Sequence, residues 1–137
     1  MKRDRNAFVL LVEDNPADAI LVEEALSEAQ VDCGLRIVGD GSKALEFIGR
    51  VETGQERCPD LVLLDLNLPR LSGGEVLERL RTSPSCHSVK VLIVTSSNAA
   101  SDRERAMALG ATDYFRKPST LTQFLELGPK VRQMLDS

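Results

Sequence analysis

Short runs of consecutive hydrophobic residues alternate along the chain with stretches in which hydrophobic residues recur every three or four positions. The short runs predict strands buried on both faces of a sheet, because a half-exposed strand would alternate hydrophobic and polar residues. The stretches between them predict helices. This alternation is typical of a parallel sheet with helices on both faces. The five expected strands are residues 8–12, 35–38, 61–64, 89–94 and 113–116.

The first two predicted helices have candidate caps. Asn15 is expected to cap a helix over residues 16–29, because its side chain accepts hydrogen bonds from the free N–H groups of the first turn. Pro16 fits the first helical position, where its missing N–H has no partner to lose. Ser42 is expected to cap the second helix, and a polar connection over residues 49–59 follows.

The later helices are marked by a capping sequence and by glycines. Residues 72–75, Ser-Gly-Gly-Glu, fit a capping box at the start of a third helix. A fourth helix is expected over residues 101–109, stopped by Gly110. A final helix is expected from residue 120 onward. The dipeptide Gly128-Pro129 lies inside it and should kink or break it.

Composition and charge narrow the class of protein. Hydrophobic residues make up 42% and charged residues 28% of the 137 positions, which is ordinary for a globular protein of one domain. The formal net charge of −4 argues against a nucleic-acid partner, because sequence-independent binding needs a basic surface. The apolar run behind the basic N-terminus is too short for a signal peptide or a membrane span, so no membrane contact is expected.

The cysteines predict a reducing environment. Cys33, Cys58 and Cys86 are odd in number, show no CxxC spacing and fall in predicted connecting segments. Such a pattern favours free thiols and a cytoplasmic protein. With one histidine in the chain, the cysteines also leave no zinc-binding constellation.

Polar side chains collect where the predicted strands end. An acidic pair or a lone lysine after a strand is usually part of a solvated loop, so each signal alone is weak. In an open α/β sheet, however, the carboxyl ends of the strands form the ligand-binding edge. The residues that follow strands are Glu13 and Asp14, then Asp65 and Asn67, then Thr95, Ser96 and Ser97, and finally Lys117.

Three carboxylates at one edge predict a cation. Held close together, Glu13, Asp14 and Asp65 would repel one another, and one or more would take up a proton unless a cation intervened. Mg²⁺ suits this set because it is a hard ion that prefers oxygen ligands and keeps several waters. We expect these three carboxylates and the Asn67 carbonyl to supply part of an octahedral shell.

A metal alone leaves Thr95 and Lys117 without a role. A phosphoryl group on Asp65 would give them one, because its oxygens would accept hydrogen bonds from the Thr95 hydroxyl and the Lys117 ammonium. Aspartate is an established covalent acceptor of phosphoryl groups. The sequence therefore predicts Asp65 as a nucleophile held rigidly at the end of a core strand.

These residues resemble those of the response-regulator receiver domain, the CheY-like family. The resemblance runs from about residue 8 to residue 127 within a single predicted domain, residues 1–137. The motifs that carry it are VLLVEDN with Glu13 and Asp14, LLDLNLPRLSG with Asp65, Pro69 and Gly73, VLIVTSS with Thr95, and GATDYFRKP with Tyr114 and Lys117.

The resemblance implies both a fold and a switch. The fold is a three-layer, flavodoxin-like α/β sandwich with strand order 2-1-3-4-5. A sensor histidine kinase or a histidine phosphotransfer protein would phosphorylate Asp65 in a reaction that needs Mg²⁺. The receiver would catalyse only its own phosphorylation and dephosphorylation, so it is a signalling phosphoacceptor and not an enzyme acting on other substrates.

The resemblance also assigns roles to individual residues. Thr95 and Lys117 would act with Asp65 in phosphorylation, and Thr95 and Tyr114 would be the switch residues. Asn67 and Ser97 match positions that tune hydrolysis of the acyl phosphate.

No output domain is expected after Lys117, so output would be protein–protein contact through the fourth helix, fifth strand and fifth helix. A homodimer through the same face is expected. The segments LVEDNPADAILVEEAL and LDLNLP look more like stand-alone receivers that serve phytochrome-type sensor kinases than like the chemotaxis protein.

Four alternatives remain open. A chemotaxis-type receiver acting on a flagellar motor shares the motifs, and a pseudo-receiver interaction module would share the fold without phosphorylation. A haloacid-dehalogenase-type phosphatase would have a second Asp where this chain has Asn67. A flavodoxin-like nucleotide carrier would have phosphate-binding hydroxyls and N–H groups where this chain has Glu13 and Asp14.

Overall fold

The computed structural model describes residues 7–137, which form one five-stranded parallel sheet in the order β2-β1-β3-β4-β5. This order confirms the predicted flavodoxin-like α/β fold. Parallel pairing is continuous across the sheet, from β2 through to β5. The strands are β1 (Ala7–Val12), β2 (Cys33–Val38), β3 (Leu61–Leu64), β4 (Lys90–Thr95) and β5 (Asp113–Arg116).

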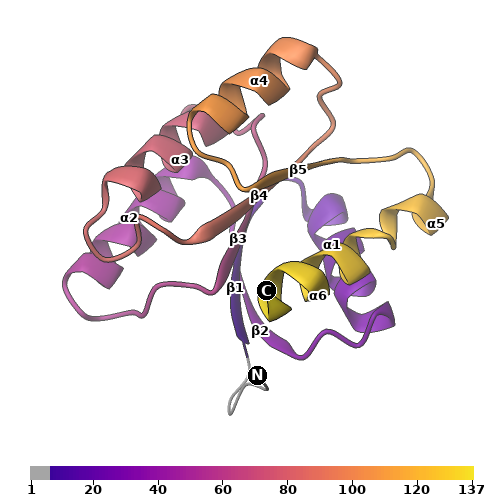
Figure 1. The fold of residues 1–137 in the computed structure, drawn as a ribbon, viewed down its shortest axis with the longest axis horizontal. Coiled ribbons are helices and arrows are strands. Elements are labelled where there is room, and N and C mark those ends of the chain that lie inside the picture. Colours follow the sequence, from indigo (N-terminus) through magenta and orange to yellow (C-terminus); the bar gives the residue numbers. More distant parts are fainter. Residues whose placement is uncertain (1–6) are drawn as a thin grey trace.

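Helices cover both faces of the sheet. In Figure 1, α2, α3 and α4 lie on one side of the strands, and α1, α5 and α6 lie on the other. None of the helices that the structure describes combines the length and the apolar composition that crossing a bilayer requires. The helices are α1 (Pro16–Glu28), α2 (Gly41–Glu52), α3 (Gly73–Thr82), α4 (Ala100–Ala108), α5 (Leu121–Phe124) and α6 (Leu127–Asp136).

The central strands contribute side chains to two separate hydrophobic cores, one on each face of the sheet. Val62 and Leu64 of β3 pack into the core beneath α2 and α3, whereas Leu61 and Leu63 pack into the core beneath α1 and α6. All four side chains are fully buried. Successive strand residues point to opposite faces, so an uninterrupted apolar run is what a strand covered on both sides needs. The prediction from residues 61–64 is confirmed.

Two helix caps were predicted correctly and one was not. Asn15 and Ser72 cap α1 and α3 as expected. The second helix is capped by Asp40 and not by Ser42, because the Asp40 carboxylate accepts a 2.8 Å hydrogen bond from the backbone N–H of Lys43. This helix also continues to Glu52, four residues into the predicted polar connection, because burying the Val51 side chain extends its apolar face.

The last helix is interrupted, as Gly128-Pro129 predicted, but the break lies just before that pair. A short α5 ends at Phe124, and α6 begins at Leu127. Pro129 therefore falls in the first turn of α6, where its missing N–H removes no helical bond. A Cβ at Gly128 would collide with the carbonyl oxygen of Ala25 on α1. Glycine at this position lets α6 pack closely against α1.

The prediction of three free thiols was wrong for two of them. Cys58 and Cys86 form a disulfide with their Cα atoms 5.7 Å apart, while Cys33 is free. Cys58 precedes β3 and Cys86 precedes β4, and these strands are parallel neighbours. The segments that lead into these two strands therefore lie side by side at the amino-terminal end of the sheet, although 28 positions separate the cysteines in sequence. This bond does not fit a compartment that keeps thiols reduced.

Reducing this disulfide is expected to lower thermal stability. Closing a loop of 28 positions restricts the unfolded chain, which is worth about 3.6 kcal/mol in the loop-entropy description. For a domain of this size the melting temperature should fall by roughly 10 °C on reduction. Differential scanning calorimetry with and without a thiol reductant measures this, and Cys58→Ser should reproduce the loss. Cys33→Ser is the matched control, and an unchanged melting temperature on reduction would contradict the expectation.

Candidate functional site

Sheet-type hydrogen bonds continue past the strand ends and fix the backbone of the candidate site. The N–H of Glu13 donates to the Val38 carbonyl at 3.1 Å, and the N–H of Asp65 donates to the Val12 carbonyl at 3.2 Å. At the other side of the sheet, the N–H of Lys117 donates to the Thr95 carbonyl at 2.7 Å. The residues that follow β1, β3 and β5 are therefore positioned by the sheet itself.

Three carboxylates meet at this edge. One oxygen each from Glu13, Asp14 and Asp65 lies within 4.8 Å of the others. Glu13 and Asp65 are buried, whereas Asp14 is exposed and keeps the cluster open to solvent. An all-oxygen set with one open side suits a hard divalent cation that retains water ligands. The donor set fits the predicted magnesium site.

Lys117 lies at the centre of an ion network. Its ammonium contacts carboxylate oxygens of Glu13 at 2.7 Å, Asp18 at 2.8 Å and Asp65 at 3.2 Å. The Lys117 side chain is only 8% exposed. Among residues 7–137 it is the basic side chain that forms ion pairs with these acids, so it supplies the positive charge beside Asp65.

Burial and neighbouring charges shift two pKa values in this network. Desolvation is the largest effect on Glu13, and together with the nearby charge of Asp65 it raises the pKa of Glu13 to about 7, against the hydrogen bond from Lys117. For Lys117, burial acts to lower the pKa, but the hydrogen bonds to Asp18 and Glu13 outweigh it and the pKa is raised. Lys117 therefore stays charged, while Glu13 titrates near neutrality.

The Asp65 side chain is held by its own loop. Its Oδ1 accepts a 3.1 Å hydrogen bond from the backbone N–H of Asn67, and its Oδ2 faces Lys117. Gly73 returns the chain to this point by donating its N–H to the Leu66 carbonyl at 3.1 Å. A Cβ at Gly73 would collide with the Asp65 carbonyl oxygen. Glycine is required there because two backbone segments nearly touch.

Thr95 connects the Asp65 loop to the segment after β4. Its buried hydroxyl oxygen accepts hydrogen bonds from the Asn67 amide at 3.3 Å and from the Ser97 N–H at 3.4 Å. The carbonyl of Ser97 in turn accepts a 3.1 Å hydrogen bond from the Tyr114 hydroxyl. The predicted switch residues Thr95 and Tyr114 are thus two hydrogen bonds apart, linked through Ser97.

The structure brings most of the predicted residues together and adds one. Glu13, Asp14, Asp65, Asn67 and Lys117 converge as expected. Ser97 differs, because its hydroxyl donates to Asp102 and accepts from the N–H of Ala99, so the side chain bonds within the β4–α4 segment. Its predicted effect on hydrolysis stays a prediction. The residue that sequence reasoning missed is Asp18: an acid in the first turn of α1 was indistinguishable from an ordinary partner of the helix dipole.

The chain is similar to known proteins in sequence and in fold. The chain matches the response regulator receiver domain family over residues 9–127. It is 34% identical over 122 residues to the response regulator Rcp1 of Synechocystis sp., an alignment that covers 87% of this chain and 82% of Rcp1. The solved structure of Mn²⁺-bound Rcp1 superposes with a TM-score of 0.82 at 32% identity, covering 93% of this chain and 92% of that one.

Two further structures are similar. The phosphorylated cyanobacterial phytochrome response regulator RcpA superposes with a TM-score of 0.87 at 30% identity, over 97% of this chain and 96% of that one. The receiver domain of a sensor histidine kinase from Pseudomonas aeruginosa, with a magnesium ion in its active-site cleft, gives a TM-score of 0.77 at 27% identity over 97% of this chain and all of that one. The chain belongs to the response regulator receiver domain family.

Proposed function

We propose that this receiver accepts a phosphoryl group on Asp65 in a Mg²⁺-dependent reaction and passes the signal on by protein contact. The observation that carries the proposal is the convergence on Asp65 of two other carboxylates and the Lys117 ammonium. A decayed pseudo-receiver would have no need to keep this set together. A dehalogenase-type phosphatase would need a second Asp at the position of Asn67.

The chain's own groups would act as follows. A carboxylate oxygen of Asp65 attacks the phosphorus, and an O–P bond forms as the N–P bond of a donor phosphohistidine breaks. The electron pair of the N–P bond stays on the ring nitrogen, and the imidazole leaves neutral because its other nitrogen already carries a proton. The N–H of Asn67 orients the carboxylate, and Lys117 neutralises charge on the phosphoryl oxygens. Glu13, Asp14 and Asp65 would hold a Mg²⁺ ion, which supplies further neutralisation of phosphoryl charge.

Phosphorylation would then change the hydrogen bonding of the Thr95 hydroxyl. This hydroxyl now accepts bonds from Asn67 and Ser97, and a new anionic acceptor at Asp65 would compete for its proton. Movement of Thr95 would bias the Ser97 segment and, through it, Tyr114. In thermodynamic terms the added charge shifts an equilibrium between two existing arrangements. Asn67 contacts both Asp65 and Thr95, which supports its proposed influence on hydrolysis.

We infer that the phosphoryl donor is a sensor histidine kinase or a histidine phosphotransfer protein of a phytochrome-type pathway. The support is the likeness to Rcp1 and to the phytochrome response regulator RcpA, which matches this chain along almost its whole length. This favours the phytochrome-type assignment over a chemotaxis receiver. A single domain without an output domain, and a cytoplasmic location, stay predictions, and the Cys58–Cys86 bond argues against the latter.

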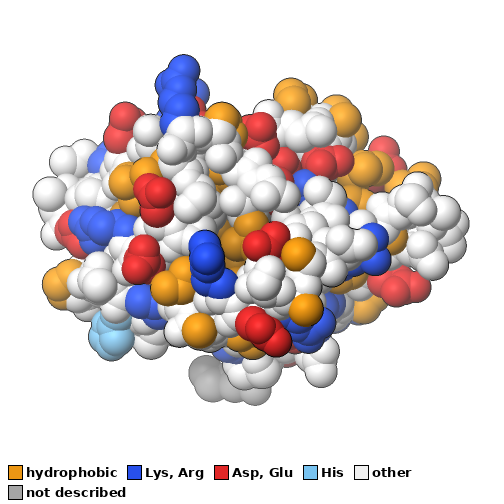
Figure 2. All heavy atoms as spheres, turned by 90° about the horizontal axis from the view of Figure 1, so that it is seen from above, with side chains coloured by type: hydrophobic (Ala, Val, Ile, Leu, Met, Phe, Trp, Pro, Cys, Tyr) orange, Lys and Arg blue, Asp and Glu red, His pale blue; other side chains and the backbone are white. Residues whose placement is uncertain are grey.

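We also propose a homodimer through α4, β5 and the predicted fifth helix, which is α5 and α6 in the structure. The 2.7 Å ion pair between Lys130 and Asp113 joins α6 to β5. Met107 of α4 is 40% exposed and gives this face an apolar contact. Figure 2, the view from above, shows acidic, basic and hydrophobic side chains interspersed on the side of the molecule that it presents. Sedimentation velocity before and after phosphorylation tests it, and a monomer in both states would contradict it.

The main test is incorporation of a phosphoryl group from acetyl phosphate. Intact-mass spectrometry should show one added phosphoryl group with Mg²⁺ present and none with a chelator. Without the cation, Lys117 supplies one positive charge against three carboxylates, and the remaining negative charge repels an anionic donor. Label that survives hydroxylamine, or labelling that is independent of divalent cations, would contradict an acyl phosphate formed at this site.

Magnesium binding is expected to strengthen as pH rises from 6 to 8. The folded-state pKa of Glu13 is raised from 4.5 to about 7, chiefly by burial, so below pH 7 a proton occupies this carboxylate and must leave before a cation binds. The raised pKa of Glu13 also makes the stability of the metal-free protein depend on pH. Proton uptake by Glu13 contributes fully to the free energy of unfolding below pH 4.5, and this contribution is lost as pH rises through about 7. Calorimetric titration with Mg²⁺ measures the affinity, which should lose its pH dependence over this range in Glu13→Gln.

A further inference from the structure

Ser97 holds together the segment between β4 and α4. Three different groups of this one residue form hydrogen bonds: the N–H with Thr95, the carbonyl oxygen with Tyr114, and the hydroxyl with Asp102. The first two lead toward the predicted switch residues. The third leads to a residue for which the receiver motifs give no role.

The bond between Ser97 and Asp102 is the shortest of the three. The Ser97 hydroxyl donates to Oδ2 of Asp102 at 2.6 Å, a distance typical of a hydroxyl bound to a carboxylate. The same Ser97 oxygen accepts the N–H of Ala99 at 3.3 Å. Ala99 is the N-cap residue of α4, and an alanine side chain cannot cap a helix. The start of α4 is therefore anchored to Ser97 through Asp102.

This anchor determines where the Ser97 carbonyl points. With its hydroxyl fixed to Asp102 and its N–H directed at Thr95, Ser97 has little rotational freedom, and its carbonyl is presented to the Tyr114 hydroxyl. Tyr114 is half-buried in this position. A free Ser97 segment would not present its carbonyl in one direction.

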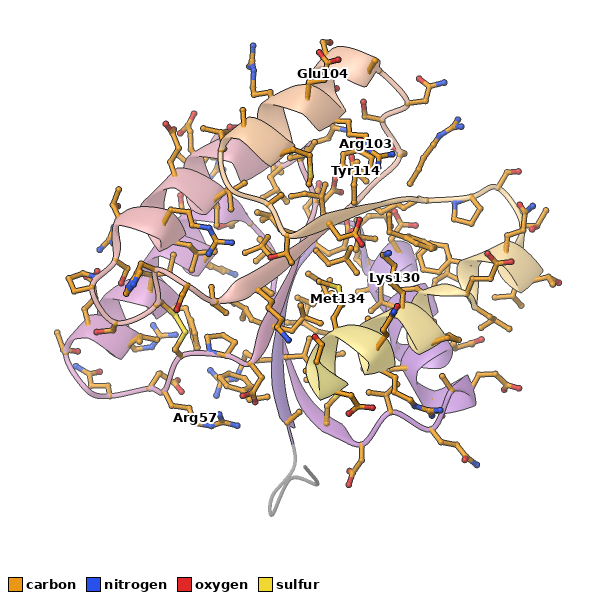
Figure 3. The ribbon with its side chains drawn as sticks, viewed as in Figure 1. Arg57, Arg103, Glu104, Tyr114, Lys130 and Met134 are labelled. Atoms are coloured by element: carbon orange, nitrogen blue, oxygen red, sulfur yellow. A yellow bond between two sulfur atoms is a disulfide. The ribbon has the colours of Figure 1, made fainter. Side chains whose placement is uncertain are left out.

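The next residue of α4 holds Tyr114 from another side. The Arg103 guanidinium lies 5.3 Å from the centre of the Tyr114 ring. Figure 3 shows Arg103 and Tyr114 together between α4 and β5, with Glu104 at the outer side of the helix. One turn of α4 thus contacts the tyrosine ring directly through Arg103 and indirectly through the Asp102–Ser97 pair.

We propose that Asp102 is a positioning residue of the switch, which fixes Ser97 by a hydrogen bond so that the Ser97 carbonyl holds the Tyr114 hydroxyl inward. The assignment of Thr95 and Tyr114 as switch residues belongs to the proposed function, and the effect on signalling rests on it. In the proposed switch, the inward tyrosine is the arrangement that phosphorylation of Asp65 favours. By linkage, a residue that favours the inward tyrosine therefore also favours the phosphorylated state. Loss of Asp102 should therefore reduce phosphorylation as well as free the tyrosine.

The test measures the accessibility of Tyr114 in the unphosphorylated protein. Tyr114 is the only tyrosine and the chain has no tryptophan, so tyrosine emission reports this one side chain. Asp102→Ala should raise quenching by acrylamide, since loss of one charge-assisted hydrogen bond shifts the inward-to-outward ratio by roughly tenfold. Asp102→Asn keeps an acceptor for the Ser97 hydroxyl and should stay close to the parent protein. Glu104→Gln, an exposed change on the same helix, is the matched control.

Two results would overturn the proposal. Quenching that is unchanged in Asp102→Ala would show that the anchor does not hold the tyrosine. Equal quenching in Asp102→Ala and Asp102→Asn would assign the effect to charge near Arg103 and not to the hydrogen bond. Combining Asp102→Ala with Ser97→Ala should add little to either single change, and simple additivity of the two would also overturn it.

A second readout separates this proposal from the proposed function. The rate of labelling by acetyl phosphate should fall several-fold in Asp102→Ala and not in Asp102→Asn. If the parent protein takes no label at all, the proposed function fails, and the quenching series still decides whether Asp102 positions Ser97. If the parent is labelled and Asp102→Ala matches it in both readouts, the positioning role fails alone.

Discussion

Asp65→Asn is expected to abolish phosphoryl incorporation from acetyl phosphate or from a histidine kinase. An amide has nearly the same shape as the carboxylate, and its one oxygen can still accept the N–H of Asn67, so the loop should keep its conformation. The contact of the second Asp65 oxygen with Lys117 is lost. The amide oxygen is a poor nucleophile, however, and the acyl phosphate cannot form. The expected loss is complete within the sensitivity of intact-mass spectrometry.

The control for this prediction is Asp136→Asn, which removes an exposed carboxylate at the end of α6 and should leave labelling unchanged. Circular dichroism checks that both variants are folded. Labelling of Asp65→Asn at the parental rate would mean that another side chain accepts the phosphoryl group, and the assignment of the nucleophile would have to be abandoned.

Lys117→Ala is expected to leave magnesium binding largely intact while uncoupling phosphorylation from switching. The lysine offers no metal ligand, and its removal leaves the oxygens of Glu13, Asp14 and Asp65 in place. The phosphoryl group would lose its charge-assisted donor. Loss of one such preorganised donor typically costs about 10²–10³ in rate. Labelling should therefore be slow, and the label that does form should not change Tyr114 emission or the sedimentation coefficient.

Lys43→Ala, an exposed lysine near the start of α2, is the matched control for a lost positive charge. Calorimetric titration gives the magnesium affinity of each variant, and quenching of Tyr114 reports the switch. A Lys117→Ala protein that is labelled at the parental rate and switches normally would require a different role for the lysine. Loss of magnesium binding in this variant would contradict the separation between ligands and charge donor.

The positions of most site residues could be predicted from the sequence, because the patterns that place them involve only neighbouring residues. A continuous apolar run such as residues 61–64 needs burial on both faces, and a residue that follows such a strand must lie at the carboxyl edge of the sheet. This places Asp65 and, by the same reasoning, Glu13 and Lys117. The caps at Asn15 and Ser72 are equally local, since each side chain bonds to the turn that follows it.

The features that were missed depend on neighbours that are distant in sequence. Asp18 is recognisable only when Lys117, 99 positions later, is known to reach it. Cys58 and Cys86 pair because β3 and β4 are adjacent, which the cysteine spacing does not reveal. The Ser97–Asp102 bond spans five positions but depends on where α4 begins, and helix boundaries are the least certain part of a pattern-based prediction.

The position of the disulfide has one more consequence. It joins the segments that enter β3 and β4, whereas Asp65 and Thr95 leave those same strands at the opposite edge of the sheet. The disulfide and the proposed phosphorylation site are thus separated by the full length of the two strands. Oxidised and reduced preparations should therefore tolerate heat differently yet respond to a phosphoryl donor alike.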